Sequence, residues 1–350
     1  MNKKILMLIW DATNGYRFKL ILFWLSCGFS FYFVPILVNP YIFSLFGNLY
    51  QEKLLTVRYA VILSFAYAIM YSMKELFRFL FIEKYLWYGC LLKVENVLRK
   101  KIFNYVMGHP VNYYNDKMSG VIAEKANKVA GNFPTAFFFF TNIVSSFICL
   151  IVSLVIYFKI NYILTLAFCV WSVLFFILYY FSSKFTFKRR KMTSAEISVV
   201  NGIINDDIAN IKNIKSFSNE KFEEEIIKKQ DNVILEKVSN EIKVESLFQF
   251  LNSVVNVALT IAIYSLSYYL VFNKQIMIGT FVFIAQNIVI LKINMRSIQK
   301  DTKTFIELSA EIKDGLDTLL EDYSVVDKKD SKKLKFKSGK IVFKNINFKY

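Results

Sequence analysis

Two asparagines stand in a stretch of the chain that is otherwise apolar, where an amide side chain has few partners. Asn252 and Asn256 are four residues apart in the uncharged run Ser246–Asn273, so a helix would place both on one face. An amide left unpaired in apolar surroundings is costly. Two explanations fit the spacing: hydrogen bonds between helices, or contacts to a bound polar ligand.

A second polar group, formed by Lys74, Glu75 and Arg78, interrupts another apolar stretch. Glu75 and Arg78 are three residues apart, which allows an ion pair along one helix. A charge in hydrocarbon costs at least ~2.5–3.5 kcal/mol, so such groups face a cavity, pair with one another or lie at the membrane boundary. Both a pathway lining and a boundary cluster remain open. Arg78 is the better candidate for the pathway, because an anionic substrate needs a fixed cation.

Residue types that carry metal, redox or hydrolytic chemistry are sparse. His109 is the only histidine, and Cys27, Cys90, Cys149 and Cys169 are scattered without metal or redox spacing. No G-x-x-x-x-G-K-[ST] phosphate-binding loop occurs in the sequence. These 350 residues therefore predict no metal site, and they predict no ATP hydrolysis by this chain alone.

The polar groups lie among long uncharged runs that predict membrane-spanning helices. Leu20–Gly47 is 28 residues without a charge, where about 20 suffice to cross a bilayer. Short and long connections alternate, and polar–apolar periodicity through the long ones predicts helices that continue beyond the bilayer. We predict six spans, at about 20–47, 58–82, 134–158, 160–183, 247–272 and 276–295.

The chain is both apolar and strongly basic, with 55% hydrophobic residues and a net charge of +17. Such a charge is typical of nucleic-acid binding. However, 37 of the 44 Lys and Arg residues fall at the N-terminus, in the two long connections and after the sixth span. The positive-inside rule places those segments, and both ends of the chain, on the cytoplasmic or matrix side. The charge therefore indicates topology, and no nucleic-acid partner is predicted.

The end of the sequence changes character. Residues 326–338 are rich in Lys, Asp and Ser and predict a linker. The segment KIVFKNINFKY at 340–350 has a nearly alternating apolar pattern that predicts a β-strand. One or two strands cannot bury a core in water, so this segment predicts the start of a β-rich domain.

Three further segments complete a family pattern: LRKKIFNYVMGHPVNYYNDKMSG at 98–120, NIKNIKSFSNEKF at 210–222 and IGTFVFIAQNIVIL at 278–291. With the six spans and the strand-like tail, they resemble the type-I ABC exporter half-transporters. The resemblance implies an all-α membrane fold of six helices with long cytoplasmic extensions, followed by the first β-strands of a truncated nucleotide-binding domain. The expected parts are an N-terminal cytoplasmic segment (1–16), the transmembrane domain (17–322), a linker (323–338) and the start of the nucleotide-binding domain (339–350).

The resemblance also implies how such a chain would be driven. ATP and Mg²⁺ would act through the nucleotide-binding domain, where Tyr350 would stack on adenine. The other partners would be an identical or homologous half-transporter and the lipid bilayer. Two coupling helices, at 124–133 and 196–208, would contact the nucleotide-binding domain through Glu124, Asn127, Asn132, Glu196, Asn201, Asn205 and Asp206.

KSFSNEKF, followed about thirty residues later by FLNS at 250–253, is similar to the mitochondrial branch of this family. That branch exports a glutathione-linked sulfur or iron–sulfur precursor. The resemblance implies a glutathione-like ligand between helices two, five and six, in a mitochondrial or mitosomal inner membrane, with a bacterial plasma membrane as the alternative. The implied contacts are Arg78, Asn252, Asn256, Gln286, Asn294 and Lys300.

Two other functions remain open. Within the same family, the chain fits a lipid or drug exporter. In a different class, it fits a channel or receptor whose basic helices bind anionic lipid or nucleic acid. The sequence contains neither a selectivity-filter motif nor the Arg repeat of a voltage sensor, which favours a transporter.

Overall fold

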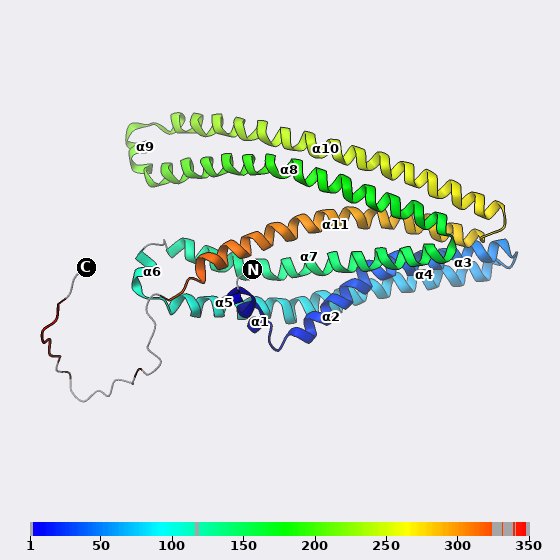
Figure 1. The fold of residues 1–350 in the computed structure, drawn as a ribbon, viewed down its shortest axis with the longest axis horizontal. Coiled ribbons are helices and arrows are strands. Elements are labelled where there is room, and N and C mark those ends of the chain that lie inside the picture. Colours follow the sequence, from blue (N-terminus) through cyan, green and yellow to red (C-terminus); the bar gives the residue numbers. More distant parts are fainter. Residues whose placement is uncertain (1–2, 116–118, 324–330, 332–338, 340, 348–350) are drawn as a thin grey trace.

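The computed structural model describes residues 3–115, 119–323, 331, 339 and 341–347, and most of them are helical (Figure 1). Several of the helices continue directly into one another. The elements are α1 (Lys3–Ala12), α2 (Arg17–Cys27), η1 (Gly28–Val38), α3 (Asn39–Gln51), α4 (Val57–Phe77), η2 (Arg78–Leu91), α5 (Leu92–Met107), α6 (Val111–Asn115), α7 (Ser119–Ile160), α8 (Tyr162–Ala209), α9 (Ile211–Phe217), α10 (Glu220–Phe272) and α11 (Ile278–Leu319).

The prediction of six membrane helices is confirmed. Among the described residues, six continuous helical segments are long and apolar enough to cross a bilayer: Arg17–Gln51, Val57–Met107, Gly120–Ile160, Tyr162–Ala209, Glu220–Phe272 and Ile278–Leu319. The shortest of these has 35 residues, or about 52 Å at 1.5 Å per residue, whereas the hydrocarbon core is about 30 Å thick. Every segment is therefore longer than the bilayer requires.

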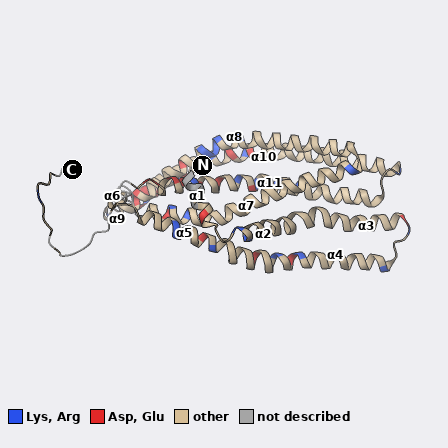
Figure 2. Ribbon diagram, turned by 60° about the horizontal axis from the view of Figure 1, so that its bottom comes forward, with Lys and Arg blue, Asp and Glu red and all other residues tan. Residues whose placement is uncertain are grey.

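The two ends of the bundle differ in charge. Figure 2 shows Lys, Arg, Asp and Glu gathered at the end that carries α6 and α9, and few of them at the end where α3 meets α4. We call these the charged end and the apolar end. The short connections at the apolar end contain Lys53 and Lys274, both with positive φ, and Asn161, whose Oδ1 accepts from the Ile163 N–H at 2.8 Å to cap α8. The short connections thus lie at the apolar end of the bundle, and the long helical extensions lie at the charged end.

Wide turns interrupt the first two spans. η1 and η2 are π-helices, and Pro35 lies inside η1. Proline has no N–H to donate to the preceding turn and its ring crowds that turn, so irregular helix is the expected local response. η1 is held by α11, because Asn287 Nδ2 donates to the Ile36 carbonyl oxygen at 2.5 Å and Asn287 Oδ1 accepts from Tyr157 Oη of α7 at 2.8 Å.

Separate apolar clusters stabilise the two ends. One is formed by α7, α8, α10, α11 and η1, with Trp171, Tyr157 and Phe168 as its largest members. The other lies at the charged end and joins α5 and α7 to the end of α11 through Leu316 and Leu319. Tyr323, just after α11, stacks on Tyr105 at 4.9 Å between ring centroids. The last turn of α11 is therefore packed against α5.

The structure differs from the prediction at the chain's end. Residues 341–347 are exposed and have no strand structure, although their apolar alternation predicted one. A strand needs a neighbouring strand for its backbone hydrogen bonds, and no described residue pairs with this segment. Tyr350 and most of the predicted linker lie outside the described residues.

The predicted coupling segments are also placed differently. Residues 124–133 lie inside α7 and residues 196–208 inside α8, so neither forms a separate helix. Each segment contains one glycine, Gly131 or Gly202, but neither contains a proline, and a single glycine inside a long helix is tolerated. The short helices between long ones are α6 and α9, both at the charged end. α9 ends at Phe217, and the next residue, Ser218, has positive φ.

Candidate substrate cavity

A cavity of about 520 Å³ opens between α8, α10 and α11. Its walls combine aromatic, amide, hydroxyl and charged side chains, which suits a polar ligand with a small apolar part. The lining residues that carry the argument below are Arg190, Gln249, Asn252, Asn256, Arg296, Lys300 and Lys303.

The two asparagines that the sequence singled out both line this cavity, but they differ in their partners. Asn256 Oδ1 accepts a hydrogen bond from Trp171 Nε1 at 2.9 Å, which joins α10 to α8. Asn252 is 8% exposed, and its Oδ1 is buried without a hydrogen-bond partner among the described residues. The interhelical explanation therefore holds for Asn256, while Asn252 keeps a free acceptor.

Three cations on α11 face the cavity. Arg296, Lys300 and Lys303 are spaced by four and three residues and so share one helix face. None of them forms an ion pair with a described residue. The sequence interpretation named Lys300 and missed Arg296 and Lys303. The i, i+4, i+7 spacing after an apolar span could have identified all three.

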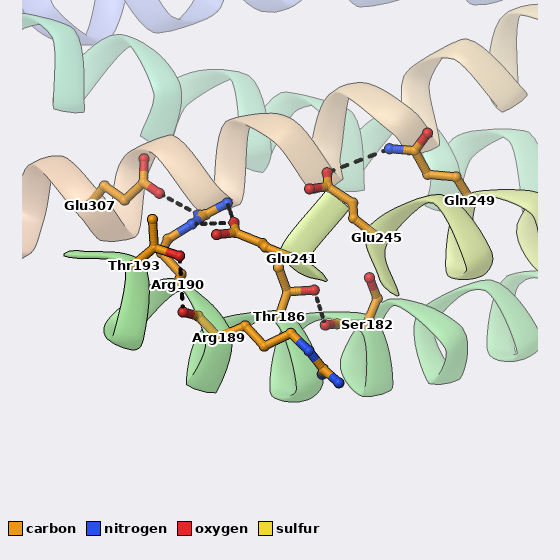
Figure 3. Close-up of polar contacts among 9 residues, drawn as sticks. All are labelled: Ser182, Thr186, Arg189, Arg190, Thr193, Glu241, Glu245, Gln249 and Glu307. Atoms are coloured by element: carbon orange, nitrogen blue, oxygen red, sulfur yellow. Dashed lines mark hydrogen bonds and ion pairs between the residues drawn. The ribbon is translucent and has the colours of Figure 1, made fainter. Parts of the chain in front are cut away.

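A fourth cation holds the cavity's wall together. Arg190 of α8 contacts Glu241 of α10 through Nε and Nη2 at 2.9 and 2.8 Å, and Glu307 of α11 through Nη1 at 2.8 Å. Figure 3 shows the guanidinium between the two carboxylates, with Glu245 and Gln249 further along α10. Arg190 is thus ion-paired inside the protein. The three α11 cations form no ion pair with a described residue, although Glu245 and Glu307 line the same cavity.

Three other predicted contacts lie elsewhere. Arg78 is bound to Glu75 at 2.9 Å and Glu83 at 2.7 Å on its own helical segment, so the predicted local pair with Glu75 forms. Gln286 is exposed, and Asn294 is buried with both amide atoms unpaired among the described residues. None of the three lines the cavity.

Three of the predicted coupling residues contact other side chains, one within its own helix and two on other helices. Glu124 pairs with Lys128 at 2.7 Å, Asn132 Nδ2 donates to Glu311 at 2.7 Å, and Glu196 accepts from Gln230 at 2.8 Å. Asn127, Asn201, Asn205 and Asp206 are exposed.

The turn that contains α9 is closed by an ion pair near its end. Lys215 and Glu220 approach to 3.0 Å across the turn between α9 and α10. The pKa of Glu220 lies below its usual value because its carboxylate accepts hydrogen bonds, first from its own backbone N–H and then from Lys215. The connection between α8 and α10 is therefore a defined structure at the charged end.

Comparisons with known proteins agree with this architecture. Residues 18–292 match the family described as the ABC transporter transmembrane region. An uncharacterized ABC transporter ATP-binding protein of Haemophilus influenzae is 24% identical over 257 residues, which are 72% of this chain and 41% of that protein. A solved bacterial Atm1-family ABC exporter with ATP bound has a TM-score of 0.71 at 12% identity, covering 91% of this chain and 56% of the other. The chain thus spans about half the length of these relatives.

Proposed function

Because the chain belongs to the ABC transporter transmembrane region family and has the transmembrane fold of an ABC exporter, we propose that it is the membrane part of an ATP-driven half-transporter. Its proposed substrate is an anionic, glutathione-linked sulfur or iron–sulfur precursor. The substrate would bind in the cavity between α8, α10 and α11 and cross the membrane by alternating access.

The charge of the cavity is the observation that carries this proposal. Arg296, Lys300 and Lys303 face a volume of about 520 Å³, within the usual 300–1,000 Å³ range of small-molecule sites. They are joined by Asn252, with its unpaired Oδ1, and by the neutral amide of Gln249. The cavity lining has four cations, Arg190 and the three on α11, against two carboxylates, Glu245 and Glu307. This excess of positive charge beside amides and hydroxyls suits a ligand with several carboxylates and peptide groups, as in glutathione.

We place the charged end on the cytoplasmic or matrix side, because basic residues concentrate there. α6 and α9 would then be the segments that contact a nucleotide-binding domain, in place of 124–133 and 196–208. ATP and Mg²⁺ would be held by that domain, since these 350 residues contain no phosphate-binding loop. A second half-transporter, identical or homologous, would complete the assembly. The proposed location is a mitochondrial or mitosomal inner membrane, with a bacterial plasma membrane as the alternative.

The proposed substrate is tested by measuring the rate of ATP hydrolysis of the complete transporter in lipid nanodiscs, with and without added compound. We expect oxidised glutathione to raise the rate in a saturable manner, because its carboxylates would bind the α11 cations. Neutral lipid and apolar drugs provide the comparison. Stimulation by those compounds alone would favour a lipid or drug exporter, and an absence of stimulation by oxidised glutathione would exclude our substrate.

A second prediction concerns the contribution of Lys300. We expect Lys300→Gln to raise the half-stimulating concentration of oxidised glutathione by about tenfold, since a charge-assisted hydrogen bond contributes about 1.5 kcal/mol. The matched control is Lys274→Gln, in the short connection at the apolar end and outside the cavity. Equal effects of the two substitutions would contradict a direct contact.

A further inference from the structure

A lysine lies on α11 one turn beyond the cavity, in the direction of the apolar end. Lys292 precedes Arg296 by four residues, and its Nζ donates to Thr260 Oγ1 of α10 at 3.0 Å. Thr260 in turn follows Asn256 by four residues and donates its own proton to the Asn256 carbonyl oxygen at 2.7 Å. The Lys292–Thr260 contact is therefore the next layer beyond the cavity wall formed by Asn256 and Arg296.

This layer lies deep in the membrane. Thr260 is twelve residues from the end of α10 at Phe272, and Lys292 is fourteen residues from the start of α11 at Ile278. At 1.5 Å per residue these positions are about 18 and 21 Å from the apolar end, compared with a hydrocarbon core of about 30 Å. Side chains on a helix lean toward its N-terminus, which for α11 is the apolar end. The amine therefore extends away from the charged end and stays inside the bilayer.

The charge of Lys292 is not compensated. Among the described residues, its polar contact is the neutral hydroxyl of Thr260, whose own proton is donated to the Asn256 carbonyl oxygen. One of the three ammonium donors is therefore occupied. No carboxylate of a described residue forms an ion pair with it. An unpaired charge at this depth is costly, and ionisable residues inside a membrane mark substrate and ion pathways.

Lys292 also extends a series of cations. With Arg296, Lys300 and Lys303 it follows the spacing i, i+4, i+8 and i+11, which keeps all four within one helix face. Over eleven residues this face rises about 16 Å, from the cavity toward the middle of the bilayer. Asn294, two residues from Lys292, lies on another face of α11 and is buried away from the cavity.

We propose that Lys292 binds anions at a position deeper in the membrane than the cavity cations. The transported molecule would first bind the cavity cations, and Lys292 would then receive one of its carboxylate or sulfonate groups near the membrane's centre. The four cations then form a path along α11, with Lys292 at its deep end and Thr260 holding the ammonium in place. This inference rests on the proposed function for its cargo, but it concerns a residue and a depth that the cavity does not include.

The path is tested with Lys292→Cys in the chain embedded in lipid nanodiscs. The probes are the anionic 2-sulfonatoethyl and the cationic 2-(trimethylammonium)ethyl methanethiosulfonates, and modification is read by mass spectrometry of the peptide that carries residue 292. We expect the ratio of anionic to cationic reaction rates to be at least about tenfold higher than at Lys274→Cys. The physical reason is that Arg296, Lys300 and Lys303 attract the anionic reagent.

Ile290→Cys is the matched control for access. Ile290 precedes Lys292 by two residues and so lies about 160° around the helix from it, where it packs against the apolar cluster that contains Trp171 and Tyr157. We expect it to react with either reagent at least about tenfold more slowly than Lys292→Cys, because its side chain is covered by neighbouring helices. An unreactive residue 292, equal rates at 292 and 290, or no preference for the anionic reagent would each overturn the inference.

Affinity gives an independent measurement. With oxidised glutathione as the probe, we expect Lys292→Gln to raise Kd at least about tenfold and Lys292→Arg to stay within about threefold of the unaltered chain. Equal losses in both variants would overturn a role of the positive charge. If oxidised glutathione does not bind the unaltered chain while the anionic reagent still prefers residue 292, the proposed substrate is wrong and the anion site stands.

Discussion

We expect Gly279→Ala to lower the free energy of unfolding of this membrane domain by about 3 kcal/mol, a large effect for one methyl group. Gly279 is the second residue of α11, at the apolar end, where α3 packs against it. A Cβ atom there would lie far inside the contact distance of the Ser44 carbonyl oxygen and of the Asn48 side chain. The Ser44 oxygen belongs to backbone, so α3 itself would have to move.

The same contact supplies the first hydrogen bonds of α11, which adds to the expected loss. Asn48 Oδ1 accepts from the Gly279 N–H at 3.1 Å, and Gln51 Oε1 accepts from the Ile278 N–H at 2.7 Å. These N–H groups have no partner inside the helix, so side chains of α3 cap α11. Small residues at such crossings let two helices approach closely in a membrane.

Gly202→Ala is the matched control for this prediction. Gly202 lies inside α8 with nothing within 4 Å of an added Cβ, so we expect a gain of about 0.5–1 kcal/mol from helix propensity. Denaturant unfolding in detergent micelles, followed by far-UV circular dichroism, measures both. A Gly279→Ala variant as stable as the unaltered chain would contradict the close crossing of α3 and α11.

The sequence was sufficient for features that depend on local pattern. Uncharged runs predicted the six spans, because a bilayer sets a minimum length that few other structures reach. The i, i+3 spacing predicted the Glu75–Arg78 pair, which forms at 2.9 Å. The i, i+4 spacing placed Asn252 and Asn256 on one face, and both line the cavity.

Local spacing in the sequence did not predict which helices pack against one another. Asn287 joins Ile36 and Tyr157, which are more than a hundred residues away in the chain, and no spacing rule connects them. Gln286 is the neighbouring residue, yet it is exposed, because the packing of α11 against α3 and α7 decides which of its faces is buried.

The positions of the turns between long helices were also not predicted correctly from the sequence. The coupling segments were placed by resemblance at 124–133 and 196–208, where the long helices simply continue. The turns at α6 and α9 contain Pro110 before α6 and Ser218 with positive φ after α9, which are the local signals that end a helix. Pro110 was visible in the sequence, whereas the conformation of Ser218 is known only from the structure.

The second large effect on stability is expected from substitution of Arg190. Replacing it by Ala should lower the free energy of unfolding by about 2 kcal/mol, because Glu241, whose side chain is 12% exposed, would keep its charge without a partner. Full burial of such a pair would give about 3–5 kcal/mol, but Arg190 is 32% and Glu307 51% exposed, and water screens part of the interaction.

Arg189→Ala separates this bridge from a general loss of basic charge. Arg189 is the adjacent residue, and among the described residues its side chain makes one long hydrogen bond, from Nη1 to the Phe185 carbonyl oxygen at 3.4 Å. We expect its replacement to change the free energy of unfolding by less than about 0.5 kcal/mol. Thermal or denaturant unfolding of both variants in nanodiscs gives the comparison, and equal losses would show that Arg190 has no special role.

A double substitution then tests whether the cost arises from the uncompensated carboxylate. Arg190→Met together with Glu241→Leu removes both charges and fills the space with apolar groups, which in buried ion pairs is often neutral or stabilising. We expect the double variant to recover at least half of the stability lost in Arg190→Ala. If the loss persists, the contacts of the guanidinium with α11, through Glu307, must hold the helices together instead. Arg190 joins α8, α10 and α11 around the cavity. That outcome would therefore show that the bridge maintains the shape of the cavity, and that neutralising a buried charge is not its main contribution.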